Sequence, residues 1–335
     1  MRKFLFALLA LTLLPLAAHA ADYRGKQVSI YIGYGFGGTY GAYARLFADH
    51  LPKHIPGEPT IIVQSMPGAG GIRLLNYAAN AMPADGSHLF VPPDSVVISQ
   101  LLQYEGAKYD ARKFHYIGGS EQTNMVWVVR ADTGVKTVAD LKTKEIASGH
   151  SGPGSTAFMI PALAKELLGL KVKLIAGYEG SNKTILAIEQ GELHASAFNW
   201  LAWEVAVPHW FDKAKPFAIP ILQVGLAPDP AIPDVPMLSA MVPADDLPLV
   251  NFIATHGIIG RSLAAPPGTP DDNVKTLRTA FAAMLRDPAY REDANKRKLR
   301  VIATSSEALD AAVKSSIDNA SPPVLAKARK VLYDK

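Results

Sequence analysis

The sequence predicts an α/β protein in which mainly parallel sheets are flanked by helices and divided between two domains. Short apolar runs, each long enough for one strand, alternate with amphipathic helical patterns through most of the chain. This alternation is typical of parallel sheets covered by helices on both faces. The chain has 335 residues, and a chain of this length most naturally divides into two domains.

The predicted elements follow from this alternation. Strands are expected at residues 28–32, 60–64, 88–91, 126–129, 145–148, 172–175, 193–197 and 219–224. Helices are expected between them at residues 42–51, 72–81, 158–168 and 183–190. The C-terminal third is expected to contain helices at 271–286, 305–317 and 323–333, and a further helix that begins at residue 287. In open sheets of this kind, ligands bind beyond the carboxyl ends of the strands.

The N-terminus has the pattern of an export signal. Arg2 and Lys3 precede an apolar run over residues 4–16, and Ala18-His19-Ala20 has the small-x-small form of a signal peptidase site. The apolar run is too short to span a bilayer. We therefore predict a signal peptide over residues 1–20, cleaved after Ala20.

Composition excludes several classes of function. The leader holds two basic and no acidic residues, so the remaining chain has 32 Lys and Arg against 30 Asp and Glu, a net charge of +2. Such a balance argues against a nucleic-acid surface. Cysteine is absent, which rules out disulfides and thiolate metal sites.

Two glycine-rich turns lie where a predicted strand gives way to a helix. Residues 33–41 (GYGFGGTYG) follow the first strand, and residues 65–71 (SMPGAGG) follow the second. Glycines let backbone N–H groups approach a ligand closely, and the N-terminus of a following helix favours negative charge. Two such turns on neighbouring strands predict a cradle for an anion.

Similar loops recur in the second half of the chain. Residues 148–156 (SGHSGPGST) and 177–182 (GYEGSN) each precede a predicted helix, and residues 198–203 (FNWLAW) bring three aromatic rings that could wall an organic acid. Neither the two glycine-rich turns nor the loops 148–156 and 177–182 contain Lys or Arg. A bound carboxylate would therefore be held by backbone N–H groups, hydroxyls, helix ends and bridging waters.

No cofactor or metal site is predicted. Residues 33–38 match the dinucleotide fingerprint, but the next strand ends at 64–65 in Gln-Ser without the acidic residue that would bind the ribose. His50 and His54 have helix-face spacing for a metal, yet Pro52 lies between them and no third ligand follows.

One enzymatic alternative stays open on the residues alone. Ser151 lies in a Gly-His-Ser-Gly-Pro sequence that resembles a nucleophile elbow, although Pro153 replaces its final glycine. An exported hydrolase acting on acyl or ester groups through Ser151 is the alternative to a binding protein.

Seven short motifs, in order along nearly the whole mature chain, resemble the periplasmic receptors of tripartite tricarboxylate transporters, the Bug family. They are Gly-Gly-Thr at 37–39 running into Ala44-Arg45, the loop 66–71, Pro-Ala-Asp-Gly at 83–86, Ser-Gly-Pro-Gly at 151–154, Gly-Tyr-x-Gly at 177–180, Gly-Glu at 191–192, and 265–270 (APPGTP).

The resemblance implies a two-domain periplasmic-binding-protein clamshell, type II-like, with the chain crossing between lobes near residues 122–125 and 251–257. Domain 1 would comprise residues 22–124 together with 256–335, and domain 2 residues 125–255. The resemblance also implies a binding protein that is not an enzyme, needs no cofactor, and resides in the periplasm.

The family's binding loops carry over to this chain by position. The near side of the ligand would be bound by Gly35, Phe36, Gly37, Gly38, Thr39, Tyr40, Pro67, Gly68, Ala69, Gly70 and Gly71. The far side would be bound by Ser151, Gly154, Ser155, Thr156, Tyr178, Ser181, Asn182, Phe198 and Asn199. Gly41 stands where the family commonly has Asp, and Tyr34 to Phe36 replace a proline-rich turn.

The function implied is capture of a small organic carboxylate: a di- or tricarboxylate, an aromatic acid or an acidic amino acid. A monomeric receptor would deliver it to the small and large membrane subunits of a tripartite tricarboxylate-type transporter. A receptor that presents its ligand to a membrane sensor kinase would have the same sequence features.

Overall fold

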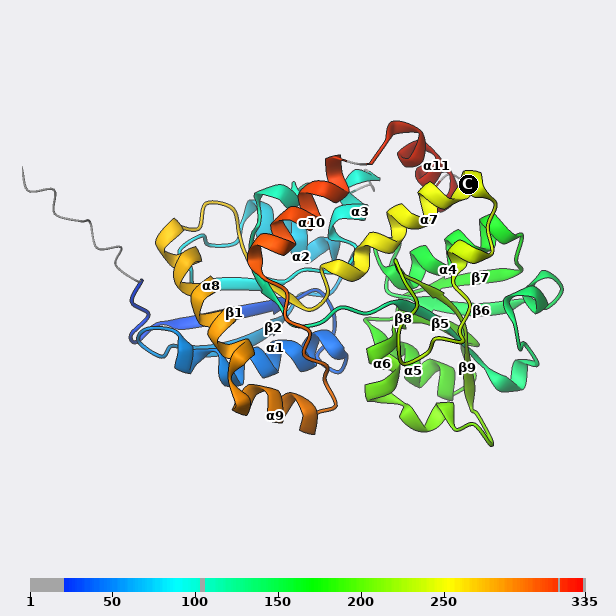
Figure 1. Ribbon diagram of the computed structural model, residues 1–335, viewed down its shortest axis with the longest axis horizontal. Helices are drawn as coiled ribbons and strands as arrows, with labels where there is room; N and C mark the ends of the chain where they lie inside the picture. The colour runs from blue at the N-terminus through cyan, green and yellow to red at the C-terminus, as the bar shows by residue number, and fades with distance from the viewer. Residues whose placement is uncertain (1–20, 103–105, 319, 334–335) are drawn as a thin grey trace, which may run out of the picture.

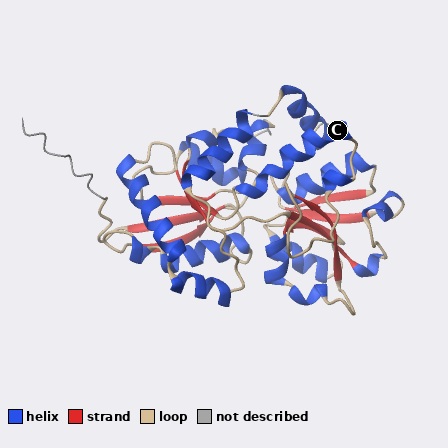
Figure 2. Cartoon of the chain, in the orientation of Figure 1, coloured by secondary structure: helices blue, strands red, loops and turns tan. Residues whose placement is uncertain are grey.

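The computed structural model describes residues 21–102, 106–318 and 320–333, so the predicted signal peptide lies outside the described residues. The chain forms two lobes side by side, each a central sheet covered by helices (Figure 1). Figure 2 shows the strands of each lobe enclosed between layers of helix.

The first lobe contains a five-stranded sheet in the order β2-β1-β3-β10-β4. β1 pairs in parallel with β2 and β3, whereas β10 pairs antiparallel with β3 and β4. β1 lies between two strands, and accordingly five of its six residues are buried. The strands are β1 (Gln27–Ile32), β2 (Thr60–Ser65), β3 (His88–Val91), β4 (His115–Gly119) and β10 (Ser262–Ala265).

Six helices cover this sheet, and their apolar faces form its core. Phe47 of α1 packs edge-to-face on Phe281 of α8, with ring centroids 5.1 Å apart and both side chains fully buried. The helices are α1 (Thr39–His50), α2 (Ile72–Asn80), α3 (Val96–Leu101), α8 (Asp271–Arg286), α9 (Pro288–Lys296) and α10 (Ser306–Asp318).

The second lobe repeats the plan with the strand order β7-β6-β8-β5-β9. β6 pairs in parallel with β7 and β8, and β5 pairs antiparallel with β8 and β9. Its strands are β5 (Met125–Arg130), β6 (Ile146–His150), β7 (Val172–Ala176), β8 (Ala195–Asn199) and β9 (Ala218–Val224). Its helices are α4 (Thr156–Leu168), α5 (Ser181–Glu189), α6 (Trp200–Ala206) and α7 (Leu247–Ala254).

The two-domain α/β fold is confirmed, and each sheet is mixed, with two parallel and two antiparallel pairings. Every predicted strand is present. β4 and β10 were not predicted, because β4 ends in two glycines and β10, with the sequence Ser-Leu-Ala-Ala, has no β-branched or aromatic residue. It also missed the short helices α3, α6 and α7.

The chain passes between the lobes after β4 and again before β10. The C-terminal helix α11 (Pro322–Leu332) then packs on α4 and α7 of the second lobe, as Figure 1 shows in red beside yellow α7. Its Arg329 donates to the carbonyl oxygens of Leu101 and Leu102 at the end of α3. The predicted domain boundaries, which assign α11 to the first domain, stay a prediction.

A side-chain link also joins the lobes away from the sheets. Arg300, in the segment after α9, pairs with Glu204 of α6 at 2.7 Å and with Asp229 at 3.1 Å. Asp229 is 5% exposed and belongs to the proline-dense connection after β9. Arg300 therefore forms an ionic contact between the lobes.

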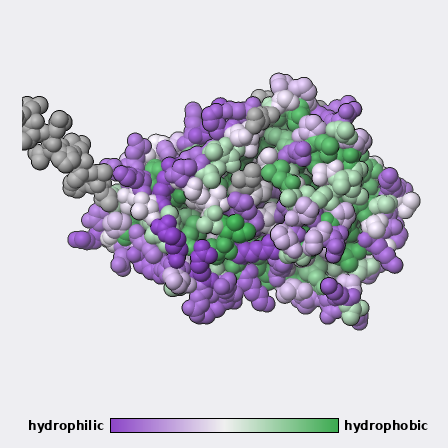
Figure 3. Space-filling view, viewed as in Figure 1, coloured by the Kyte–Doolittle hydropathy of each residue, from purple (hydrophilic) through white to green (hydrophobic). Residues whose placement is uncertain are grey.

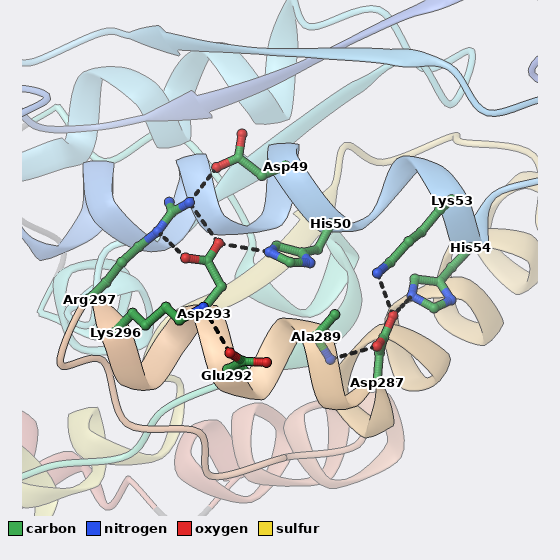
Figure 4. A network of polar contacts seen from close by, with 10 residues as sticks. All are labelled: Asp49, His50, Lys53, His54, Asp287, Ala289, Glu292, Asp293, Lys296 and Arg297. Atoms are coloured by element: carbon green, nitrogen blue, oxygen red, sulfur yellow. Dashed lines mark hydrogen bonds and ion pairs between the residues drawn. The ribbon is translucent and has the colours of Figure 1, made fainter.

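The histidine pair singled out in the sequence fastens α1 to α9 (Figure 4). His50 Nε2 lies 2.8 Å from Asp293, which also pairs with Arg297, and His54 Nε2 lies 3.1 Å from Asp287. Because each imidazole has its own carboxylate partner, the pair has a structural role. No group of three or more metal-ligating side chains occurs in the described ranges.

On the face of the molecule in Figure 3, hydrophilic residues prevail around the first lobe, whereas more hydrophobic residues are exposed on the second lobe. Among residues 21–333 as described, no helix is both long and apolar enough to cross a membrane.

Candidate functional site

A cavity of about 320 Å³ lies between the two lobes. Its walls come from loops that were predicted to bind ligand in both halves of the sequence. From the first lobe these are Gly35, Phe36, Gly37, Gly38, Thr39 and Tyr40. From the second lobe they are Ser151, Ser155, Thr156, Ser181, Asn182, Phe198 and Asn199.

Three helices begin at this cavity without a side-chain cap. α1 starts after Gly38, α4 after Ser155 and α5 after Gly180, and none of these N-cap residues makes a side-chain capping bond. The first-turn N–H groups of a helix have no intrahelical acceptor, and the helix dipole adds partial positive charge there. All three N-termini contribute lining residues, so the cavity is suited to an anion.

The first glycine turn brings backbone of the two lobes together at the cavity wall. Gly35 N donates to Glu179 O at 3.0 Å. A Cβ on Gly37 would lie 2.4 Å from the amide of Asn182, and one on Gly38 would lie 2.8 Å from Ser181 Oγ. The second lobe therefore approaches this turn at its glycines, where added atoms would meet the side chains of Asn182 and Ser181.

Gly41, where the family commonly has Asp, has a local explanation. A Cβ at this position would lie 2.1 Å from the carbonyl oxygen of Phe36. The same carbonyl accepts a bond from Arg45. The turn thus folds back onto the start of α1, and only a residue without a side chain fits there.

Residues 67–71 of the second glycine turn do not line the cavity, although Ser65 at its start does. Pro67, Gly68, Ala69, Gly70 and Gly71 are absent from its walls. Instead Gly70 N donates to Ser151 O at 3.2 Å, and a Cβ on Gly70 would lie 2.4 Å from Ser155 N.

Gly154 and Tyr178 also lie away from the cavity walls. Gly154 O accepts a bond from Ser95 Oγ at 2.5 Å, which joins the lobes. Tyr178 OH donates to Glu192 at 2.5 Å on the outer side of α5. The direct ligand-binding roles of these two residues and of residues 67–71 stay predictions that the cavity geometry does not favour.

Several polar groups expected to meet the ligand have protein partners. Asn199 Oδ1 caps α6 by accepting from Ala202 N, and Ser155 Oγ donates to Gly152 O. Tyr40 OH accepts from Asp94 N, and its ring lies 4.5 Å from that of Tyr34. Of the aromatic residues at 198–203, Phe198 lines the cavity while Trp200 and Trp203 are core.

A buried ion pair in the cavity wall was missed from the sequence. Arg261 precedes β10 and Asp94 follows β3, and the Nη1–Oδ1 distance is 2.7 Å. Arg261 also donates to Thr39 Oγ1, and its guanidinium lies 3.8 Å from the centroid of Tyr40. Burial opposes the charged form of Arg261, but the facing Asp94 carboxylate raises its pKa overall.

The four glycine- and serine-rich loops contain no Lys or Arg, but the cavity lining includes one of each: Arg261 from outside those loops and Lys183 from the first turn of α5. An isolated arginine beside a buried apolar strand was the available signal for Arg261. Other lining residues not predicted as ligands are Tyr34, Ser65, Asp94, Met125, Ala157, Glu179, Gly180 and Ala202.

Ser151 lacks the surroundings of a nucleophile. His150 Nδ1, the neighbouring imidazole nitrogen, accepts from Gly152 N at 3.1 Å, and burial lowers the pKa of His150. No hydrogen bond joins the Ser151 hydroxyl to a histidine within the described residues, so the base that would activate it is not in place.

Two α/β lobes with a cavity between them, lined by uncapped helix N-termini, define the class of bilobal solute-binding receptors. Within that class, the chain belongs to the family of tripartite tricarboxylate transporter family receptors, whose model matches residues 43–324. It is accordingly a periplasmic solute-binding receptor and not an enzyme, as the resemblance of its motifs implied.

Relatives and solved structures agree with this membership. A UPF0065 protein of Cupriavidus necator is 25% identical over 87% of this chain and 84% of its own length, and one of Bordetella pertussis is 23% identical over 85% and 84%. The periplasmic binding protein BugD is similar in structure, with a TM-score of 0.72, 18% identity, and coverage of 92% of this chain and 98% of BugD.

Two structures of similar proteins contain ligands. Rpa4515 of R. palustris, solved with adipate, has a TM-score of 0.71 and 22% identity, covering 92% of this chain and 98% of its own. MatC of Rhodopseudomonas palustris, solved with bound malate, has a TM-score of 0.70 and 17% identity, covering 91% and 98%.

Proposed function

We propose that this receptor captures a small organic carboxylate in the periplasm and delivers it to the small and large membrane subunits of a tripartite tricarboxylate-type transporter. The observation that carries the proposal is the meeting of three uncapped helix N-termini, from α1, α4 and α5, at one interlobe cavity. Carboxylates bound in the similar structures, adipate and malate, support the ligand class.

In the proposed mechanism the carboxylate binds first-turn N–H groups of these helices, and the two lobes close over it. The lobes already touch through backbone bonds such as Gly35 N to Glu179 O and Gly70 N to Ser151 O. A ligand favours this closed arrangement only to the extent that it binds it better than the open one. Each charge-assisted hydrogen bond contributes about 1.5–3 kcal/mol.

The ligand class is tested by thermal unfolding of the purified mature receptor against mono-, di- and tricarboxylates, aromatic acids and acidic amino acids. A ligand at a hundredfold excess over its Kd stabilises by about 2.7 kcal/mol, which raises Tm by several degrees. No shift with any acid would refute the proposal.

The helix N-termini are tested by Thr156→Asp, at the first residue of α4 and in the cavity wall. An aspartate there stabilises the helix but repels a bound carboxylate. We expect affinity to fall by about tenfold or more, since a close like-charge contact costs more than about 1 kcal/mol. The neutral isostere Thr156→Asn should retain affinity; equal losses in both variants would show that charge at this helix end is irrelevant.

A further inference from the structure

The buried pair of Asp94 and Arg261 is built into the cavity wall with little freedom. The two residues are 5% and 2% exposed. Arg261 uses Nη1 on Asp94 and Nη2 on Thr39, and Tyr40 stacks on its guanidinium. Its Nε is enclosed and has no partner within the described residues. Both terminal nitrogens of Arg261 therefore already have partners in the cavity wall, and one of them fixes the position of Asp94.

Asp94 keeps one oxygen for another partner. Oδ1 accepts from Arg261, whereas Oδ2 accepts no bond from any residue that the structure describes. Oδ2 is also not among the fully enclosed unpartnered atoms, and Asp94 lines the cavity. A carboxyl oxygen at a nearly buried position needs a hydrogen-bond partner. The cavity therefore presents a hydrogen-bond acceptor close to the first turn of α1.

The charges around the cavity also limit the ligand. Its lining has two acidic side chains, Asp94 and Glu179, and two basic ones, Arg261 and Lys183, so the formal side-chain charge is zero. The helix N-termini add partial positive charge sufficient for one carboxylate. Of the two basic side chains that the described lining contains, the buried Arg261 is already paired and Lys183 is exposed to solvent, so a second free carboxylate would gain no buried cation and would lie near the acceptor of Asp94.

We propose that the ligand carries, next to its carboxylate, a hydrogen-bond donor that binds Asp94 Oδ2, and so is an amino acid or a hydroxy acid rather than an unsubstituted di- or tricarboxylate. This inference rests on the proposed function, because the helix N-termini must hold the carboxylate. Asp94 then determines specificity, since a site that hydrogen-bonds a ligand donor rejects the analogue that lacks it.

The wild-type receptor tests this with acids of matched skeleton, measured by calorimetry. One set is glutamate, 2-hydroxyglutarate and glutarate; the other is phenylalanine, phenyllactate and 3-phenylpropanoate. In the skeleton that binds, we expect the amino or hydroxy acid to bind at least about tenfold more tightly than the unsubstituted acid. The tighter of the two identifies the donor as ammonium or hydroxyl.

Equal or tighter binding of the unsubstituted acid would overturn this inference while leaving the proposed function intact. No binding by any acid in either set or in the broader panel would overturn both.

The variant Asp94→Asn tests the residue itself. It preserves side-chain size but places an amide where Asp94 Oδ2 was available to the ligand. The affinities for donor-bearing and unsubstituted acids should therefore differ by no more than about threefold. Glu189→Gln, at an exposed position on α5 outside the cavity walls, is the control and should keep the wild-type preference. An unchanged preference in folded Asp94→Asn, checked by circular dichroism, would overturn the assignment; the wild-type ligand series stands independently if that variant fails to fold.

Discussion

The first glycine turn, residues 33–41, lines the ligand cavity, whereas the second, residues 67–71, packs on the backbone of the opposite lobe. The first turn meets mainly side chains of α5, such as Ser181 and Asn182. The second meets backbone atoms of Gly154 and Ser155. The two turns have similar composition and follow neighbouring strands, yet the first lines the cavity and the second forms a contact between the lobes.

This difference indicates how closure and binding are coupled. Both turns contact the loops before α4 and α5, so in the proposed mechanism the closure that brings α5 to the cavity would also bring Gly70 against Ser151. Backbone packed on backbone cannot yield, while a side chain can rotate away. Added atoms should therefore be tolerated far less at the second turn than at the first.

The largest effect is expected for Gly70→Ala. The new Cβ would lie 2.4 Å from Ser155 N and 2.6 Å from Gly154 C, which prevents the lobes from closing. We expect ligand affinity to fall by about a hundredfold or more, equivalent to at least about 2.7 kcal/mol. Calorimetric titration with the best ligand of the screen measures it.

Gly169→Ala is the matched control. Gly169 has φ +66°, close to the +69° of Gly70, but nothing lies within 4 Å of its added Cβ. Both variants share the backbone strain of about 1 kcal/mol, and only one introduces the clash. Affinity within about threefold of wild type for Gly70→Ala would contradict the closure role of the second turn.

Much of this arrangement could be predicted from the sequence because it depends on local signals. Glycine-rich turns between strand and helix patterns located the start of α1 and the lining loops of the second lobe. The different roles of the two turns could not be predicted. Whether Gly70 N meets a ligand or Ser151 O depends on how the lobes pack, and that has no local signature.

The ion pair of Asp94 and Arg261 was hidden for the same reason. The two residues are 167 positions apart, and each alone looks like a surface residue near an apolar strand. β10, which follows Arg261 directly, was also missed, since its Ser-Leu-Ala-Ala sequence lacks the β-branched and aromatic residues that mark a strand. The charged residues of the cavity wall are thus brought together by the tertiary fold, and no local sequence pattern marks them.

Buried charges around the pair of Asp94 and Arg261 predict that stability depends on pH. Glu121, between β4 and β5, is 1% exposed, and neither carboxylate oxygen has a partner within the described residues. Burial raises the pKa of Glu121 to about 7; Arg261 and Arg300 lower it, while Asp94 and Asp229 raise it further. Between about pH 4.5 and 7 the folded state thus holds a proton that the unfolded state has lost.

Glu121 should therefore make the folded state less stable as pH rises through that window, by on the order of 2–3 kcal/mol. Glu121→Gln should remove this slope, as seen in urea unfolding at pH 5, 6, 7 and 8. Glu189→Gln, at an exposed position on α5, should leave it unchanged. Parallel pH profiles for wild type and Glu121→Gln would show that Glu121 does not titrate in this range.

The smallest effect is expected for Gly38→Ala in the first turn. The backbone there has φ −91°, which alanine adopts without strain, and the close contact of the new Cβ is with Ser181 Oγ at 2.8 Å. Because that hydroxyl is the end of a rotatable side chain, we expect only about a three- to tenfold loss of affinity. The double variant Gly38→Ala/Ser181→Ala removes the clash and should bind like Ser181→Ala alone. A loss as large as that of Gly70→Ala, or one that Ser181→Ala does not relieve, would mean that the first turn too acts through rigid backbone contact, and the distinction between the two turns would fail.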